Sequence, residues 1–243
     1  MTRHHPSYAA LRLPEIRYFI GATAFFTLAS RALAVIIGFQ IYALTKSPLA
    51  LGVLGLVEAV PAISLSLFGG YAADRWDRRA ILLITRGVSV ICALLLAAIS
   101  LYPTAHTVTG LYAVIFLAGI ARGFADPAGT AFEAQVVPKS LTVNAASWIS
   151  SAWLSCSVIG PALVGFSYDI FGAAKTYLFI ALGFAVSWLC TAAITPKPKP
   201  SLPDGESILK SISLGLRFVF SEQALIGSMS LDLFAVLFGG AVA

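Results

Sequence analysis

The most informative stretch of this sequence is a short, strongly charged segment between two apolar runs. It reads Gly69-Gly70-Tyr71-Ala72-Ala73-Asp74-Arg75-Trp76-Asp77-Arg78-Arg79. The flanking runs, Leu49–Ala73 and Ala80–Leu101, are each long enough to cross a bilayer core, which takes roughly 20 apolar residues. A charged junction between two such runs predicts a tight turn joining two membrane-spanning helices.

The composition of the whole chain agrees with a membrane protein. Of the 243 residues, 58% are hydrophobic and 11% are charged, and the mean hydropathy is +0.88. Soluble domains carry about 25% charged residues. These values exclude an ordinary soluble domain, a disordered chain and a coiled coil, and the three cysteines exclude a disulfide scaffold.

Seven apolar segments predict an all-α membrane protein, because the runs are continuous and do not alternate as barrel strands do. The predicted spans are Ile16–Leu44, Leu49–Ala73, Ala80–Leu101, Val108–Phe124, Val143–Phe166, Ala174–Ile194 and Leu225–Ala243. The first span is too long for a secretory signal and contains Arg31.

The basic residues follow these spans with a strong bias toward one side. With the N-terminus inside, thirteen Lys and Arg residues fall on the cytoplasmic side, and two, Lys46 and Lys175, fall outside. The cytoplasmic set is Arg3, Arg12, Arg17, Arg75, Arg78, Arg79, Arg86, Arg122, Lys139, Lys197, Lys199, Lys210 and Arg217. This distribution predicts a cytoplasmic N-terminus and argues against nucleic acid as a partner, despite the net charge of +5.

The chain divides into four predicted parts. Residues 1–15 form a cytoplasmic tail, residues 16–194 a six-helix bundle, and residues 225–243 a seventh helix. Between them, residues 195–224 begin with a Pro-rich linker and continue as an amphipathic helix on the inner membrane surface. Because the sequence stops at Ala243 while still apolar, we expect further C-terminal helices to be missing from it.

The charged turn has the spacing of a known signature. The sequence resembles the major facilitator superfamily, whose loop reads G-x-x-x-D-R-x-G-R-R/K. Gly70, Asp74, Arg75, Arg78 and Arg79 match it, and Asp77 replaces the second glycine. The resemblance implies that this loop latches two six-helix halves together on the cytoplasmic side, with Asp74 and Arg78 in that role.

The fifth span carries a second match. The residues Ser157-Val-Ile-Gly160-Pro161-Ala-Leu-Val-Gly165 are similar to the antiporter signature of the same family, with Cys156 and Val164 in place of two glycines. A Gly-Pro step removes one backbone hydrogen bond and thins the helix, which allows a kink and close packing. The resemblance favours export by exchange, whereas an ordinary proline kink is the alternative.

Further stretches resemble the enterobactin-exporter-like and macrolide-efflux branch of the superfamily. They are Ala121–Ala128, Val136–Pro138, Asn144-Ala145 and Glu58–Pro61. The spacing Gly165-x-x-x-Asp169 also repeats that of Gly70-x-x-x-Asp74 at the opposite membrane face, which is what two three-helix units of inverted topology produce.

Charged residues inside spans are costly, so each is a candidate functional residue. Arg31, Glu58 and Asp232 lie inside predicted spans. The depths of Arg31 and Glu58 are similar, which predicts an ion pair beside a central cavity for substrate and protons, with Glu58 carrying the proton. A static pair that locks two helices is the alternative. Asp232 is a further candidate for this cavity, and Gln40 is a weaker candidate for its wall.

Two further residues lie where the predicted fourth span meets the cytoplasm. They are Arg122 and Asp126, and we expect Asp126 to join Arg78 in the charge network of the inner face.

The function predicted from these features is secondary transport. The expected activity is proton-coupled export of an amphipathic, drug- or siderophore-like compound by alternating access in a bacterial inner or plasma membrane. No nucleotide-binding, metalloprotease or serine-hydrolase motif is present, so neither an enzyme nor a cofactor is expected. The partners expected are the lipid bilayer, a small-molecule substrate, protons and the missing helices. A non-transporting fragment and a seven-helix receptor or sensor are the alternatives.

Overall fold

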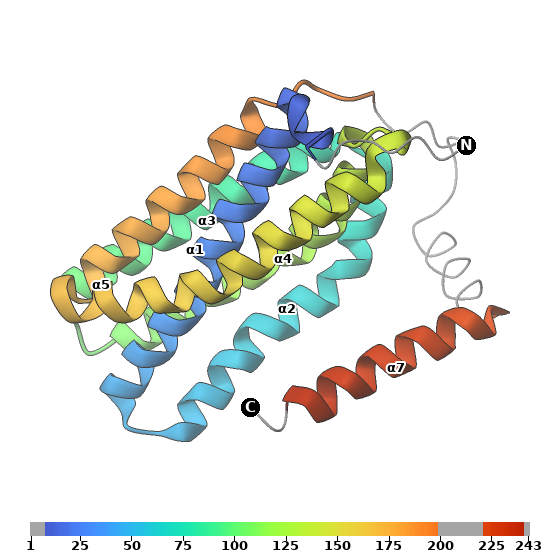
Figure 1. Ribbon diagram of the computed structural model, residues 1–243. Coiled ribbons are helices and arrows are strands. Elements are labelled where there is room, and N and C mark those ends of the chain that lie inside the picture. Colours follow the sequence, from blue (N-terminus) through green and yellow to red (C-terminus); the bar gives the residue numbers. More distant parts are fainter. Residues whose placement is uncertain (1–7, 199–220, 241–243) are drawn as a thin grey trace. The chain divides into compact units, whose positions relative to one another are not determined.

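The computed structural model describes residues 8–198 and 221–240, and every regular element in these two ranges is helical. The α-helices are α1 (Pro14–Thr45), α2 (Pro48–Arg75), α3 (Arg78–Leu101), α4 (Thr107–Val136), α5 (Thr142–Ala192) and α7 (Gln223–Gly240) (Figure 1). The chain forms two compact units, Met1–Pro200 and Ser201–Ala243, and each is described by itself. The prediction of an all-α fold is confirmed.

Helix α5 contains a sharp turn that makes it two membrane passes. Gly172 has φ 74° and ψ 175°, a backbone conformation that only glycine adopts readily. Residues 142–171 form a first arm and residues 173–192 fold back along it as a second arm (Figure 1). Five helices of the described residues, counting α5 once, are long and apolar enough to cross a membrane. The two arms of α5 therefore supply the fifth and sixth predicted spans.

The fourth helix is longer than the predicted span. Helix α4 runs from Thr107 to Val136, whereas the sequence predicted an end at Phe124. Arg122 and Asp126 suggested a membrane boundary, but both lie within the helix and pair with other charges. Pro127 also lies inside α4 without ending it.

Small residues bring the helices of the bundle close together. A Cβ atom at Gly160 of α5 would lie 2.7 Å from the carbonyl oxygen of Leu28 in α1. A Cβ atom at Gly123 of α4 would lie 2.9 Å from the carbonyl oxygen of Ala62 in α2. Without a hydrophobic driving force between helices in lipid, such close backbone approach is a main source of stability.

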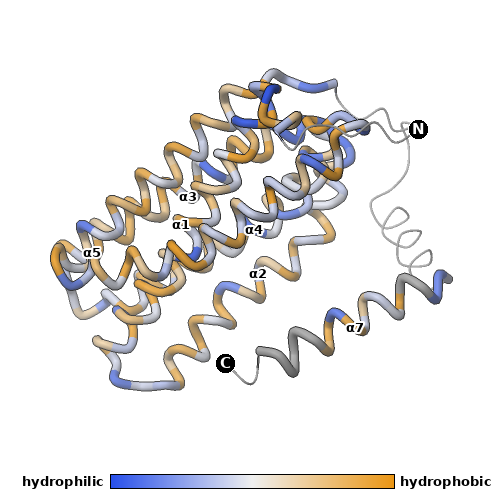
Figure 2. Tube along the Cα trace, in the orientation of Figure 1, coloured by the Kyte–Doolittle hydropathy of each residue, from blue (hydrophilic) through white to orange (hydrophobic). Residues whose placement is uncertain are grey.

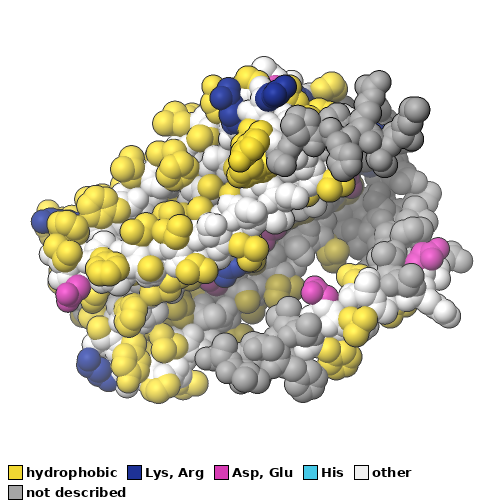
Figure 3. Space-filling view, viewed as in Figure 1, with side chains coloured by type: hydrophobic (Ala, Val, Ile, Leu, Met, Phe, Trp, Pro, Cys, Tyr) yellow, Lys and Arg dark blue, Asp and Glu magenta, His cyan; other side chains and the backbone are white. Residues whose placement is uncertain are grey.

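The interior of the bundle is apolar, and so is much of its outside. One buried cluster includes Ile36, Leu96 and Phe184, and a second includes Ile16 and Phe132. Hydrophobic residues occur along the helices of the bundle (Figure 2). Many large apolar side chains are exposed on its outside (Figure 3). A protein surrounded by lipid requires both features.

The second unit contributes helix α7. It covers most of the predicted seventh span, Leu225–Ala243, and carries Asp232. The predicted amphipathic helix lies largely outside the described residues, as do the last three residues of the chain.

Candidate functional site

Three charged side chains lie midway along α2 and α4. Glu58 is ten residues beyond Pro48, which is about 15 Å along the helix at 1.5 Å per residue. Arg122 is near the centre of α4, about 21 Å from either end by the same rise. Figure 3 shows acidic and basic side chains in the middle of the bundle as well as at its ends.

One guanidinium group holds this cluster together. Arg122 Nη1 donates to Glu58 Oε1 at 2.9 Å, and Arg122 Nε donates to Asp126 Oδ2 at 3.4 Å. Asp126 is one helical turn beyond Arg122, while Glu58 comes from the neighbouring helix. The side chains of Glu58, Arg122 and Asp126 are 38%, 55% and 65% exposed. The cluster carries a net charge of −1 when all three groups are ionised.

Close packing of α2 on α4 explains why Arg122 reaches Glu58. A Cβ atom at Gly119 would lie 2.5 Å from the carbonyl oxygen of Glu58 and 2.8 Å from Cγ of Pro61. Arg122 follows Gly119 by three residues, so it projects near the same part of α2. Glycine at position 119 thus sets the distance between the two charged residues.

The exposure of this cluster restricts what can cover it. Ionised groups at mid-membrane depth face a bundle interior or a water-filled cavity and do not face lipid. The open side of the cluster is therefore a protein-covered or aqueous side.

The predicted ion pair between Arg31 and Glu58 is wrong. Glu58 pairs with Arg122, and the guanidinium carbon of Arg31 lies 5.6 Å from the ring centroid of Trp153 in α5. Similar depth along two helices does not make two residues neighbours, because each helix also has a rotation about its own axis. Here the glycine-lined contact turns Glu58 toward α4.

The predicted contact between Asp126 and Arg78 is also wrong. Asp126 pairs with Arg122. Arg78 donates through Nε to the carbonyl of Ala73 at 2.8 Å and through Nη1 to that of Ala131 at 3.0 Å. Asp126 precedes Ala131 by five residues, which is about 7.5 Å along α4, so it lies nearer mid-helix than the end that Arg78 contacts.

Gln40 does not lie on an open cavity wall as predicted. Its side chain is 8% exposed. Its Oε1 accepts a hydrogen bond from Tyr177 Oη at 2.7 Å, and its Nε2 donates to Ser100 Oγ at 2.8 Å. Gln40 therefore links α1, α3 and the second arm of α5 inside the bundle.

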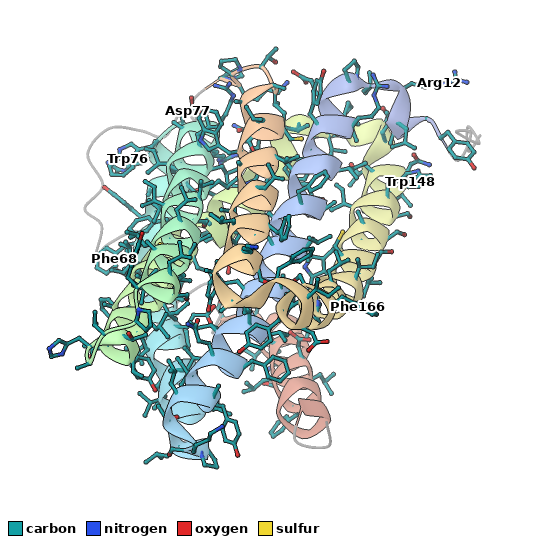
Figure 4. The ribbon with its side chains drawn as sticks, turned by 90° about the vertical axis from the view of Figure 1, so that its left-hand side faces the viewer. Arg12, Phe68, Trp76, Asp77, Trp148 and Phe166 are labelled. Carbon is teal, nitrogen blue, oxygen red and sulfur yellow. The ribbon has the colours of Figure 1, made fainter. Side chains whose placement is uncertain are left out.

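The charged turn lies at the end of the bundle that also holds Arg12, as Trp76 and Asp77 show in Figure 4. Asp77 Oδ1 accepts from the backbone N–H groups of Arg79 at 2.9 Å and Ala80 at 3.4 Å. The residue that departs from the family signature is thus the N-cap of α3, and its φ of −63° requires no glycine.

Basic side chains of the turn hold neighbouring helix ends. Arg78 Nη2 lies 3.8 Å from Asp74 Oδ1, and Arg79 Nη2 donates to the carbonyl of Ala192 at 2.6 Å. Arg75 lies over the ring of Tyr71, 4.6 Å from its centroid. A Cβ atom at Gly70 would meet no atom within 4 Å. These contacts lie within one bundle, and the predicted role of the turn as a latch between halves stays a prediction.

The Gly-Pro step of α5 packs as its composition predicts. Gly160 is buried against α1, and Pro161 lies inside the helix. Gly165 faces open space, with no atom within 4 Å of an added Cβ. Asp232 lies on α7, and its predicted role in the cavity stays a prediction.

Sequence reasoning missed a buried arginine. Arg86 was expected at the cytoplasmic surface, but its side chain is buried between α3 and the second arm of α5. It donates to the hydroxyl of Thr191 and to the carbonyl of Ser187 at 3.3 Å, and it lies over the ring of Phe26. Arg86 lies eight residues after the start of α3, inside an apolar stretch, and this position could have indicated that it is buried.

Comparison with known proteins adds to this geometry. Residues 19–243 match the model of the Major Facilitator Superfamily. A relative named Staphyloferrin A transporter, from Staphylococcus aureus (strain NCTC 8325 / PS 47), is 27% identical over 139 residues, which are 57% of this chain and 35% of the relative.

Solved structures of similar fold include POT family transporters. A POT family transporter in complex with a thioalcohol-conjugated peptide has a TM-score of 0.61 at 14% identity, over 94% of this chain and 47% of that one. The POT family transporter PepTSo has a TM-score of 0.59 at 17% identity, over 91% of this chain and 48% of that one. This chain thus spans about half the length of these transporters. The helical architecture and the match over most of its length show that the chain belongs to the Major Facilitator Superfamily of membrane transporters.

Proposed function

We propose that the protein exports a small amphipathic organic compound in exchange for protons, by alternating access of its six-helix bundle against further helices. The observation that carries this proposal is the cluster of Glu58, Arg122 and Asp126 at mid-membrane depth with part of its surface open. Alternating access moves one bundle against another around a site near the bilayer midplane. The depth of the cluster fits such a site.

The cluster supplies a chemical basis for proton coupling. When both carboxylates are ionised, they compete for Arg122. Protonation of Glu58 weakens the contact that joins α2 to α4 and leaves Arg122 with Asp126 on its own helix. A proton can therefore change which helices the cluster connects, which is what coupling to a conformational change requires.

The proposed orientation places the N-terminus in the cytoplasm of a bacterial cell. Among the described basic residues, seven lie near the end of the bundle that holds the charged turn, and two, Lys46 and Lys175, lie near the other end. The seven are Arg12, Arg17, Arg75, Arg78, Arg79, Lys139 and Lys197. An excess of Lys and Arg marks cytoplasmic loops.

The proposed substrate class is an amphipathic, drug- or siderophore-like compound. The relative named Staphyloferrin A transporter supports this substrate class, and the Gly-Pro motif of α5 supports export.

The test uses full-length protein in inverted membrane vesicles, in which export is measured as uptake. Naphthalene-2-sulfonate and ethidium serve as an amphipathic anion and cation, and an inside-acid pH gradient drives the flux. We expect gradient-driven uptake of at least one probe. We also expect Glu58→Gln to lose the gradient dependence while it retains exchange of the probe without a gradient.

A matched control separates coupling from charge loss in general. Asp169 is an exposed carboxylate at the opposite end of the bundle from the charged turn, and Asp169→Asn should behave as wild type. Uptake of neither probe by the wild type contradicts transport of this class, and Glu58→Gln with unchanged gradient-driven uptake contradicts the proton role.

A further inference from the structure

Arg31 is a mid-membrane cation that has no acidic partner in residues 8–198 and 221–240. It lies 14 residues before Thr45, which is about 21 Å along α1. Its side chain is exposed, and with the described part of the chain it forms neither an ion pair nor a hydrogen bond; its one described interaction is with the ring of Trp153. The carboxylate predicted to balance it, Glu58, is held by Arg122.

An arginine at this depth requires a partner. A charged side chain in the middle of a span faces a bundle interior or a water-filled cavity and pairs with another polar group. An aromatic ring stabilises the cation through one face, but it leaves the planar fork of five N–H donors available. This fork fits a carboxylate bidentately.

The aromatic ring of Trp153 in α5 lies beside Arg31 and adds an apolar surface that suits an organic anion. Trp153 is 43% exposed, so part of its ring is open to a second contact. Ser150 and Ser157 lie three residues before and four residues after Trp153, on the same side of the helix. The hydroxyl of Ser157 donates to the carbonyl oxygen of Trp153 at 2.8 Å, so the guanidinium and the open part of the indole ring are the groups that face a ligand.

Close packing fixes the position of this surface. A Cβ atom at Gly160 would lie 2.7 Å from the carbonyl oxygen of Leu28 and 3.2 Å from Cβ of Arg31. The backbone of α5 therefore lies directly against the turn of α1 that carries Arg31. The guanidinium and the indole are held by two helices in contact and not by a loop.

We propose that Arg31 and Trp153 form the subsite for the carboxylate of an aromatic substrate, with the guanidinium binding the anion and the indole stacking on the ring. This inference rests on the proposed function, because it assigns the substrate class of the same transporter. It also separates two tasks: the α1–α5 pair binds the anion, and the α2–α4 cluster handles the proton.

The test measures binding and does not depend on transport. Full-length protein in lipid nanodiscs is titrated calorimetrically with 2-naphthoate and with 2-naphthamide, which has the same ring system without the charge, and empty nanodiscs serve as the blank. We expect the wild type to bind the carboxylate roughly tenfold more tightly than the amide, the size of one charge-assisted contact. Arg31→Gln should remove this preference, and Arg31→Lys should retain part of it, because it keeps the charge and loses the fork.

Two further variants distinguish a binding role from a structural one. Trp153→Leu should weaken both ligands and leave their ratio unchanged, since stacking does not depend on the charge. Arg17→Gln removes an exposed arginine near the end of the same helix and should change neither affinity. A melting curve for each variant reports whether it is folded, and Arg31→Lys provides the answer if Arg31→Gln does not fold.

Three results would contradict the proposed subsite. They are equal affinity of the wild type for both ligands, no binding of either, or an unchanged preference in a folded Arg31 variant. Glu58→Gln should retain the preference for 2-naphthoate. A protein that shows this preference but no gradient-driven flux contradicts the proposed function and leaves the subsite standing.

Discussion

Two of the groups of polar side chains among the apolar helices differ in how completely they are paired. In the buried group, Tyr177 donates to Gln40, and Gln40 donates to Ser100, with none of the three ionised. In the open group, Glu58 and Asp126 share the single guanidinium of Arg122, and all three side chains are partly exposed.

This difference distinguishes polar residues that stabilise the fold from polar residues that are available for function. A buried, neutral and paired network gains nothing from rearranging, because each lost hydrogen bond leaves an unsatisfied group in an apolar interior. A charged cluster with an open side can exchange one partner for water, a proton or a ligand. The same sequence feature, a polar residue inside a span, therefore has two meanings that depend on burial.

The largest expected effect comes from separating the two helices that build the open group. In Gly119→Val, the added side chain collides with the carbonyl of Glu58 and the ring of Pro61. We expect the variant to lose most of its folded population or, where folded, its coupled flux, because overpacking of a close contact costs about 1–3 kcal/mol or more. Thermal unfolding in nanodiscs and vesicle uptake measure the two effects.

A second glycine of the neighbouring helix provides the control. A Cβ atom at Gly55 of α2 would meet no atom within 4 Å, so Gly55→Val tests the addition of the same side chain without the collision. Equal loss of stability in the two variants would show that close helix contact is not what positions the cluster.

The next effect separates the buried group from the open one. Tyr177→Phe removes the hydroxyl that donates to Gln40 Oε1 and leaves that oxygen unsatisfied in the interior. We expect a loss of about 1–2 kcal/mol in the free energy of unfolding, with gradient-driven uptake per folded molecule unchanged. Thermal unfolding and uptake are again the measurements.

The control is a second tyrosine, whose side chain is exposed. Tyr18 is exposed on α1, and Tyr18→Phe should leave the unfolding free energy unchanged. If Tyr177→Phe instead lost proton coupling at normal stability, Gln40 would belong to the transport machinery, as the sequence predicted, and the division by burial would fail.

Features set by composition and local chemistry could be predicted from the sequence. The apolar runs predict the helices, and the small residues of the Gly160-Pro161 step predict close packing, which Gly160 shows. These predictions depend on how apolar each segment is and on residues that are close together in the chain. Both properties can be determined from the sequence alone.

Pairings between helices could not be predicted in the same way. Arg122 was predicted at the membrane boundary because burying a charged residue in lipid costs free energy. The residue that compensates its charge, Glu58, is 64 residues away in the sequence. Arg86 was misplaced for the same reason, since its partners are on the second arm of α5. Which charge meets which depends on helix rotation, and glycine contacts between helices set that rotation.

The smallest expected effect concerns a polar residue of a third kind, at a helix end near water. Asp77 caps α3 by accepting from the N–H groups of Arg79 and Ala80. Asp77→Ala should lower the unfolding free energy by about 1 kcal/mol, while Asp77→Gly, which restores the family signature, should differ from wild type by a few tenths. Water can replace the lost acceptor at this end, which it cannot do for Gln40 in the interior, so the loss should be smaller than in Tyr177→Phe. Thermal unfolding of the three variants in one nanodisc preparation gives the order, and a larger loss in Asp77→Ala than in Tyr177→Phe would mean that depth in the bundle does not govern the free energy of these hydrogen bonds.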